Sequence, residues 1–118
     1  MSAKKSNVVT FGVASIEDTK ARMKRAFSGL SQGSFINFVS VELMWKVLTP
    51  KRWGIVQAMT GAGPLAIREL ARRVERDVKS VHGDVQALLK AGVIRRAPDG
   101  RVVFPFDHVR VEFEVKAA

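Results

Sequence analysis

The sequence contains no cysteine, which excludes disulfide bonds and metal sites built on thiolates. This composition fits a reducing compartment, and we expect the protein to be cytoplasmic. The chain also lacks an apolar run long enough to span a bilayer, and its polar, basic start leads into no apolar signal core. These absences predict a protein that is not exported and has no membrane contact.

Acidic residues are scarce as well: eleven Asp and Glu stand against twenty Lys and Arg, which gives a net charge of +9. A field of this sign attracts polyanions and speeds their encounter, although basic charge also serves solubility alone. The position of the charge therefore matters. Nine cations and five acids lie in residues 64–101, and six cations and two acids lie in residues 1–33.

A chain of 118 residues, of which 47% are hydrophobic, has room for one globular core and a short extension. We expect an N-terminal arm over residues 1–33 and a domain over residues 34–118 that folds without it. Residues 7–13 favour a short strand, and Ser15 caps an amphipathic helix. The apolar stripe of that helix is Ile16, Met23, Phe27 and Leu30. Because the stripe needs cover, the arm is predicted to bind a second copy or a partner protein; its cations could also contact phosphates.

The domain opens with a predicted strand at residues 35–39. Ser40 caps a short helix over residues 41–48, and Thr49 with the following proline opens another helix over residues 50–59. Both caps have the side-chain oxygen that accepts a hydrogen bond from the first turn of a helix. The spacing therefore predicts two consecutive helices directly after the strand.

Two further helices form the most informative part of the sequence. Residues 65–74 have one apolar face, and a break at residues 75–77 follows. Asp77 caps a helix over residues 78–89 whose apolar positions recur at intervals of three and four, and Gly92 ends it. Two short helices separated by about three residues form a helix-turn-helix unit.

A hairpin is predicted after this unit. Residues 93–96 and 101–104 flank Ala97–Gly100, a type I turn with proline second and glycine fourth. Residues 109–115 alternate between apolar and charged, as in a strand with one buried face. The predicted fold class is therefore α+β: a winged helix-turn-helix with an N-terminal strand/helix arm and a C-terminal β-hairpin wing.

The helix over residues 78–89 fits the major groove of DNA, and its outer face is polar. Gly83 costs ~1 kcal/mol against alanine inside a helix, so it needs a reason: close approach to DNA or tight packing on a neighbouring helix. The candidate DNA contacts are Arg68, Arg76, Lys79, Ser80, His82, Gly83, Gln86, Arg95, Arg96 and Arg101. We expect operator DNA as the partner, a nucleoid location, and a homodimer, because palindromic operators require a two-fold protein.

No catalytic, metal-binding or cofactor residue is predicted. His82 with Asp84, and Asp107 with His108, have neither a third ligand nor the spacing of a metal site. The alternatives to DNA binding are a protein-interaction adaptor and an RNA-binding module. An adaptor would not need a basic hairpin, and the tryptophans lie on apolar stripes typical of a core, whereas RNA binding favours exposed aromatic side chains.

Four segments resemble a family of small prokaryotic winged helix-turn-helix transcriptional regulators: residues 48–52, 63–73, 77–85 and 88–94. The resemblance covers roughly residues 40–115. Members of that family are described as DNA-binding proteins, and some lie beside toxin genes and are taken to be antitoxins. The resemblance thus implies a repressor, with the autoregulating antitoxin of a toxin-antitoxin system as one candidate role and a cognate toxin as a candidate partner. It also implies that Ser80, His82, Gly83 and Gln86 face the groove, and Gly83 departs from the long polar side chain often found there.

Overall fold

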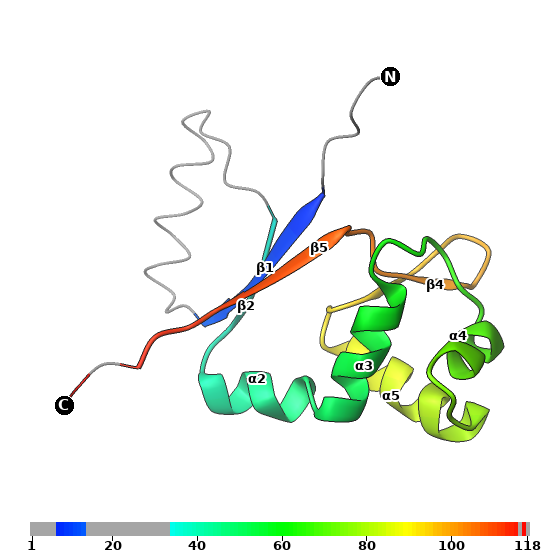
Figure 1. Cartoon of the computed structure of the whole chain (residues 1–118), viewed down its shortest axis with the longest axis horizontal. Coiled ribbons are helices and arrows are strands. Elements are labelled where there is room, and N and C mark those ends of the chain that lie inside the picture. The colour runs from blue at the N-terminus through cyan, green and yellow to red at the C-terminus, as the bar shows by residue number, and fades with distance from the viewer. Residues whose placement is uncertain (1–6, 14–33, 116, 118) are drawn as a thin grey trace, which may run out of the picture.

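The protein is described here by a computed structural model that covers residues 7–13, 34–115 and 117. A three-stranded sheet lies beside a group of helices and a small hairpin (Figure 1). The elements are β1 Val8–Val13, β2 Ser34–Phe38, α2 Val41–Val47, α3 Pro50–Met59, α4 Ile67–Arg73, α5 Val78–Lys90, β3 Arg95–Arg96, β4 Val102–Val103 and β5 His108–Glu112. The predicted α+β class is confirmed. No helix within the described ranges is long and apolar enough to cross a membrane.

The sheet has the strand order β2-β1-β5, and both pairings are parallel. Its central strand is β1, in which Val9 and Phe11 are fully buried. The ring of Phe11 meets the rings of Trp53 and Phe104 edge-on, with centroids 6.3 and 6.1 Å apart. The strand predicted for a separate arm is thus in the main core, because its apolar side chains pack against the helices.

The helix predicted over the rest of the arm lies outside the described residues. This also holds for the four side chains predicted to bind a second copy or a partner, which are Ile16, Met23, Phe27 and Leu30. The boundary predicted at residue 33 separates two strands of one sheet, since β1 pairs with β2 from Val9↔Ser34 to Val13↔Phe38.

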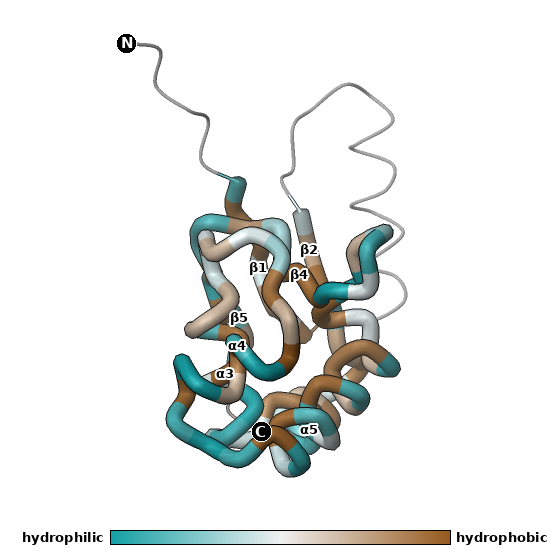
Figure 2. Tube along the Cα trace, turned by 90° about the vertical axis from the view of Figure 1, so that its right-hand side faces the viewer, coloured by the Kyte–Doolittle hydropathy of each residue, from teal (hydrophilic) through white to brown (hydrophobic). Residues whose placement is uncertain are grey.

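Three of the four predicted helix caps are confirmed, and the fourth, Ser15, lies outside the described residues. The side chains of Ser40, Thr49 and Asp77 accept hydrogen bonds from the backbone N–H groups of the third residue on, at 3.1, 3.3 and 2.9 Å. Helices α3, α4 and α5 pack on one another through fully buried apolar side chains. These side chains are Ile55, Val56, Met59, Leu70, Val81, Val85 and Leu88. The turn between α4 and α5 is hydrophilic, whereas α5 alternates between apolar and polar along its length (Figure 2).

The predicted hairpin is confirmed as the antiparallel pair β3–β4. Its turn is closed by a 2.9 Å hydrogen bond from the Gly100 N–H to the Ala97 carbonyl, and Gly100 takes a φ of +90°, which favours glycine. Leu65, just before α4, exchanges two backbone hydrogen bonds with Val102 at 2.8 and 2.9 Å. The hairpin is therefore fastened to the start of the helical unit.

Two expectations about burial are wrong. The last strand ends at Glu112, and the side chains of Val111 and Phe113, predicted to lie on a buried face, are 44% and 41% exposed. Trp45, predicted as core, is 55% exposed on α2 and meets the ring of Phe113 at 5.8 Å. Val111 lies on β5, an edge strand paired only with β1 among the described residues, so neighbouring strands flank its side chain on one side alone, and Phe113 lies beyond the end of that strand.

Candidate nucleic-acid interface

Helix α5 presents a polar face that the rest of the described chain leaves uncovered. Its Val81, Val85 and Leu88 are fully buried and fix its inner face. Five of the six side chains predicted to point outward from this helix are exposed, and His82 is exposed beside them. The exposed positions predicted to contact DNA are Lys79, Ser80, His82, Gly83 and Gln86. The sixth outward position, Ala87, is half-buried instead.

Gly83 has no packing reason within the described part of the chain. A methyl group added to it would meet no atom within 4 Å, which removes tight packing on a neighbouring helix as the explanation. Gly54 in α3 is equally open, so an open helical glycine alone does not mark a site. Gly83 differs from Gly54 because it is exposed and lies among polar side chains.

The position of α5 is fixed by ion pairs to Asp84, which sequence analysis did not identify. The Asp84 carboxylate accepts hydrogen bonds of 3.1 Å from Arg52 Nε and 2.8 Å from Arg76 Nη2. Arg52, at the start of α3, also donates to the carbonyls of Lys46 and Val47 at the end of α2. This cluster connects α2, α3 and the α4–α5 turn to α5.

Arg76 is predicted to be an exposed DNA contact, but in the structure its side chain forms an ion pair within the protein. Its side chain is only 20% exposed and is held by Asp84. Burial alone would raise the pKa of Asp84, yet the hydrogen bonds from Arg76 and Arg52 hold that pKa below its ordinary value. Arg76 is a positioning residue for α5, and no local sequence signal links it to a carboxylate eight residues later.

On α4, Arg68 is exposed as predicted, and no ion pair between described residues includes it. Arg72 and Arg73 instead share the carboxylate of Glu69. The hydrogen bond from Arg73 and the nearby charge of Arg72 lower the pKa of Glu69, and together they outweigh the desolvation that would raise it. The basic charge of α4 that is free of acidic neighbours is thus concentrated at Arg68.

The hairpin carries three exposed arginines in unequal settings. Arg96 donates a 3.0 Å hydrogen bond to the Gly100 carbonyl. Arg101 forms a 2.7 Å ion pair with Asp99, whose pKa is lowered by hydrogen bonds from the Arg101 backbone and side chain. Arg95 takes part in no ion pair with another described residue. Arg95 therefore offers the least compensated charge of the three.

Helix α4, the start of α5 and the hairpin lie at one end of the molecule, away from α2 (Figure 1). The exposed aromatic ring of Trp45 is on α2 and so is not among the basic side chains. The end formed by α4, the start of α5 and the hairpin carries five of the candidate DNA contacts: Arg68, Lys79, Ser80, Arg95 and Arg96. The structure thus separates an exposed basic region from an exposed aromatic one.

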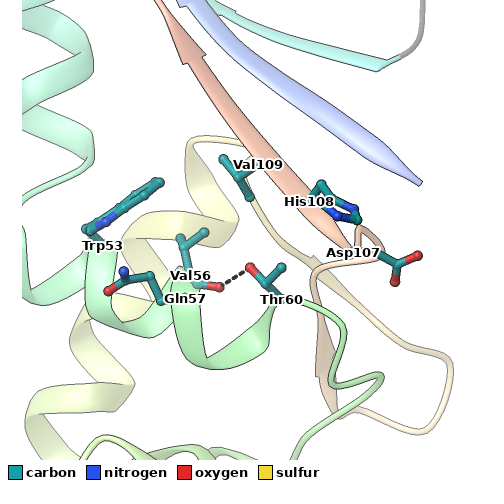
Figure 3. A pocket seen from close by; sticks show the side chains of 7 residues that line it. All are labelled: Trp53, Val56, Gln57, Thr60, Asp107, His108 and Val109. Carbon is teal, nitrogen blue, oxygen red and sulfur yellow. Dashed lines mark hydrogen bonds between the residues drawn. The ribbon is translucent and has the colours of Figure 1, made fainter. Parts of the chain in front are cut away.

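An open groove of about 310 Å³ lies between α3 and β5. In Figure 3 the side chains of Trp53, Val56 and Val109 lie along it, and Thr60 Oγ1 donates a 2.8 Å hydrogen bond to the Val56 carbonyl. Asp107, at one end, accepts a 3.3 Å hydrogen bond from the Asn7 N–H. Within the described residues no cluster of three or more His, Asp or Glu side chains could hold a metal ion.

In a comparison with protein-family models, the HVO_A0114 model matches residues 47–111. These residues extend from the end of α2 to β5 and include all of α3, α4, α5 and the hairpin. No curated protein matches the chain.

Proposed function

The chain belongs to the HVO_A0114 family, and we propose that it is a transcriptional regulator that binds double-stranded DNA. In this proposal the fold is a winged helix-turn-helix: α4 and α5 are the helix-turn-helix, and the β3–β4 hairpin is the wing. The three-helix packing of α3, α4 and α5 supports this assignment. The bridge between Leu65 and Val102 supports it too, because it holds the hairpin beside the helical unit.

The observation that carries the proposal is the uncovered polar face of α5 on a helix whose position is locked. A helix that reads the major groove must expose hydrogen-bonding side chains near its N-terminal end. Lys79 and Ser80 are exposed in the first turn, and Gln86 is exposed further along. Asp84, on the flank, is held by Arg52 and Arg76 and so keeps this face at a fixed angle.

The surrounding charge supports contacts to phosphates, which supply most of the affinity of such complexes. Arg68 on α4, Lys79 on α5 and Arg95 on the hairpin are exposed and take part in no ion pair between described residues. We propose that these three cations contact the DNA backbone on either side of the groove that receives α5.

The same surface argues less for RNA. Sequence-specific RNA binding uses exposed aromatic rings on which bases stack. The exposed aromatic side chains of the described residues are Trp45 on α2 and Phe113 just after β5. They contact each other and lie apart from the basic end. That pair would serve a protein contact and not DNA recognition.

Gly83 provides the sharpest test. In the proposed complex a side chain at this position would stand between α5 and the DNA, so Gly83→Ala should weaken binding to the operator. By conformational entropy alone the same substitution should stabilise the helix by about 0.5–1 kcal/mol. The two effects have opposite signs, which excludes unfolding as the cause of weaker binding.

Gly54→Ala is the matched control, because Gly54 is also helical and open but lies in α3. We expect it to raise stability similarly and leave DNA affinity unchanged. Both affinities are measured by fluorescence anisotropy on a duplex from the protein's own promoter, and both stabilities by urea unfolding. Equal affinity of the Gly83→Ala variant and the wild type would refute a close approach of the α5 backbone to DNA at this position.

A further inference from the structure

We infer that β5 is a dimerisation strand, which pairs antiparallel with β5 of a second copy about a two-fold axis at Val111. The two three-stranded sheets would then form one continuous sheet of six strands. This inference is independent of DNA binding, since it rests on the free edge, the sequence and the surroundings of β5.

Within the described part of the chain, the outer edge of β5 is open. In the order β2-β1-β5 it pairs with β1 on one side, and no described strand pairs with its other side. The backbone of such an edge has N–H and C=O groups that a further strand can satisfy, and proteins usually protect these edges. His108, Arg110, Val111 and Glu112 are all exposed on this strand.

The sequence of this strand is complementary to itself. In antiparallel pairing around Val111, Arg110 lies opposite the partner's Glu112 and Val109 lies opposite the partner's Phe113. His108 likewise lies opposite the partner's Glu114. Residues directly opposite each other interact most strongly, and the two-fold symmetry makes each of these pairs occur twice. The charges therefore attract in this register.

The two faces of the strand are also compatible with this pairing. Val109 and Val111 are in register with Val9 and Phe11, whose side chains are buried on the helical side of the sheet. Arg110 and Glu112 alternate with them and so lie on the opposite side, where they form a 2.9 Å ion pair with each other. Apolar pairs would thus join on the helical side and charged pairs on the other.

The groove of Figure 3 lies where the partner's side chain would enter. Its apolar wall is made by Trp53 and Val56 of α3, with Val109 of β5 facing them. The partner's Phe113 lies directly opposite Val109 in the proposed register. A phenyl ring that is 41% exposed in a single copy would then be covered in this groove.

The apolar surface around the strand points to the same interface. Exposed large hydrophobic side chains of the described chain concentrate on the approach to α2, on α2 itself and from Val111 onward. They are Val39, Leu43, Trp45, Val111, Phe113 and Val115, with Val78 on α5 as the exception. Trp45 contacts Phe113 and lines a hollow together with Val111, and exposed apolar surface of this kind marks interaction sites. This region lies away from α4 and the hairpin (Figure 1), so a dimer formed here leaves the basic end free.

The test uses charge reversal in the full-length protein, without DNA and at low ionic strength. Arg110→Glu would place two acids opposite each other at each pair, and Glu112→Arg would place two arginines there. Each variant alone should dimerise more weakly by on the order of tenfold or more. An equimolar mixture should recover a dimer of one chain of each kind, because the acid introduced at position 110 of one chain then faces the base introduced at position 112 of the other.

Sedimentation velocity over a range of concentrations reads out the oligomeric state, and Lys90→Glu on α5 is the matched reversal away from β5. Recovery in the mixture cannot come from the ion pair within one chain, because neither variant chain contains that pair. The proposal is overturned by a monomeric wild type, by a dimer that both reversals leave intact, or by a mixture that stays monomeric.

Discussion

Loss of the Asp84 carboxylate should loosen the helix that we propose enters the DNA. In the Asp84→Asn variant, Arg52 and Arg76 lose their shared anion. The amide can still accept one hydrogen bond, but it leaves two guanidinium groups without a counter-charge. Their side chains are only 25% and 20% exposed, so water compensates poorly for this loss.

The magnitude follows from the two hydrogen bonds. Two hydrogen bonds to a charged group contribute about 1.5–3 kcal/mol each. Because the amide keeps one of them and the cluster is partly exposed, we expect a loss of roughly 2–3 kcal/mol. This is a large share of the roughly 5–15 kcal/mol by which a domain is stable. The variant should therefore unfold at clearly lower denaturant concentration.

Urea unfolding followed by tryptophan fluorescence measures this difference, and urea is preferred because it adds no charge. Asp99→Asn is the control, since Asp99 forms an ion pair of similar length, 2.7 Å, but on the exposed hairpin. We expect little change in that variant. If Asp84→Asn and Asp99→Asn unfolded at the same urea concentration as the wild type, the proposed role of Asp84 in positioning α5 would be wrong.

The same cluster predicts a pH dependence. The pKa of Asp84 is lower in the folded protein than its ordinary value of 3.8. Its contribution to stability is therefore complete well above that pH and is lost as the pH falls through 3.8 toward the folded pKa. In a comparison of wild type and Asp84→Asn, the difference in unfolding free energy should shrink as the solution is acidified.

Three further predictions concern the hairpin and the sheet. Arg95→Ala should weaken binding to every duplex and reduce the slope of log affinity against log salt concentration by ~0.9, the value for one phosphate contact. Arg101→Ala should have a smaller effect, because Asp99 already compensates the charge of Arg101. Salt titrations followed by fluorescence anisotropy measure both slopes, and equal slopes for Arg95→Ala and the wild type would exclude the phosphate contact. Phe11→Ala should lower the unfolding free energy by about 3–5 kcal/mol, because the ring is fully buried in the central strand. Deletion of residues 1–33, which the sequence alone predicts to be tolerated, should prevent folding because it removes β1; circular dichroism showing a cooperatively folded deletion variant would contradict this.

Local features of the fold could be predicted from the sequence because neighbouring residues determine them. Ser40, Thr49 and Asp77 cap helices as expected, since a cap depends only on the residues of the first turn. The hairpin turn at Ala97–Gly100 is another such case. Helical spacing predicts the α4–α5 unit and the exposed face of α5 in the same way.

Long-range features could not be predicted in this manner. The pairing of β1 with β5 joins residues about a hundred positions apart, as in the contact of Asn7 with Asp107. An apolar alternation such as that from Val109 onward predicts a buried face, but it does not say whether another element packs over that face. For this reason the exposure of Val111 and Phe113 emerges only from the topology.

Within the candidate interface, exposure could be predicted better than ion pairing. Lys79, Ser80 and Gln86 are exposed as the helical spacing predicts. An arginine in a turn is usually solvated, which favours Arg76 as a DNA contact, but its bond to Asp84 depends on how α4 and α5 cross. The antitoxin role and its toxin partner stay predictions of the family resemblance alone.

The most direct test of the proposed function is binding of the purified full-length protein to its own promoter duplex, compared with a scrambled duplex of equal length and titrated with salt. We predict a preference for the promoter that survives physiological ionic strength, because base contacts from α5 do not depend on counterion release. Equally weak binding to both duplexes that disappears as salt is added would contradict the account, and the basic end of the molecule would then be a solvated surface.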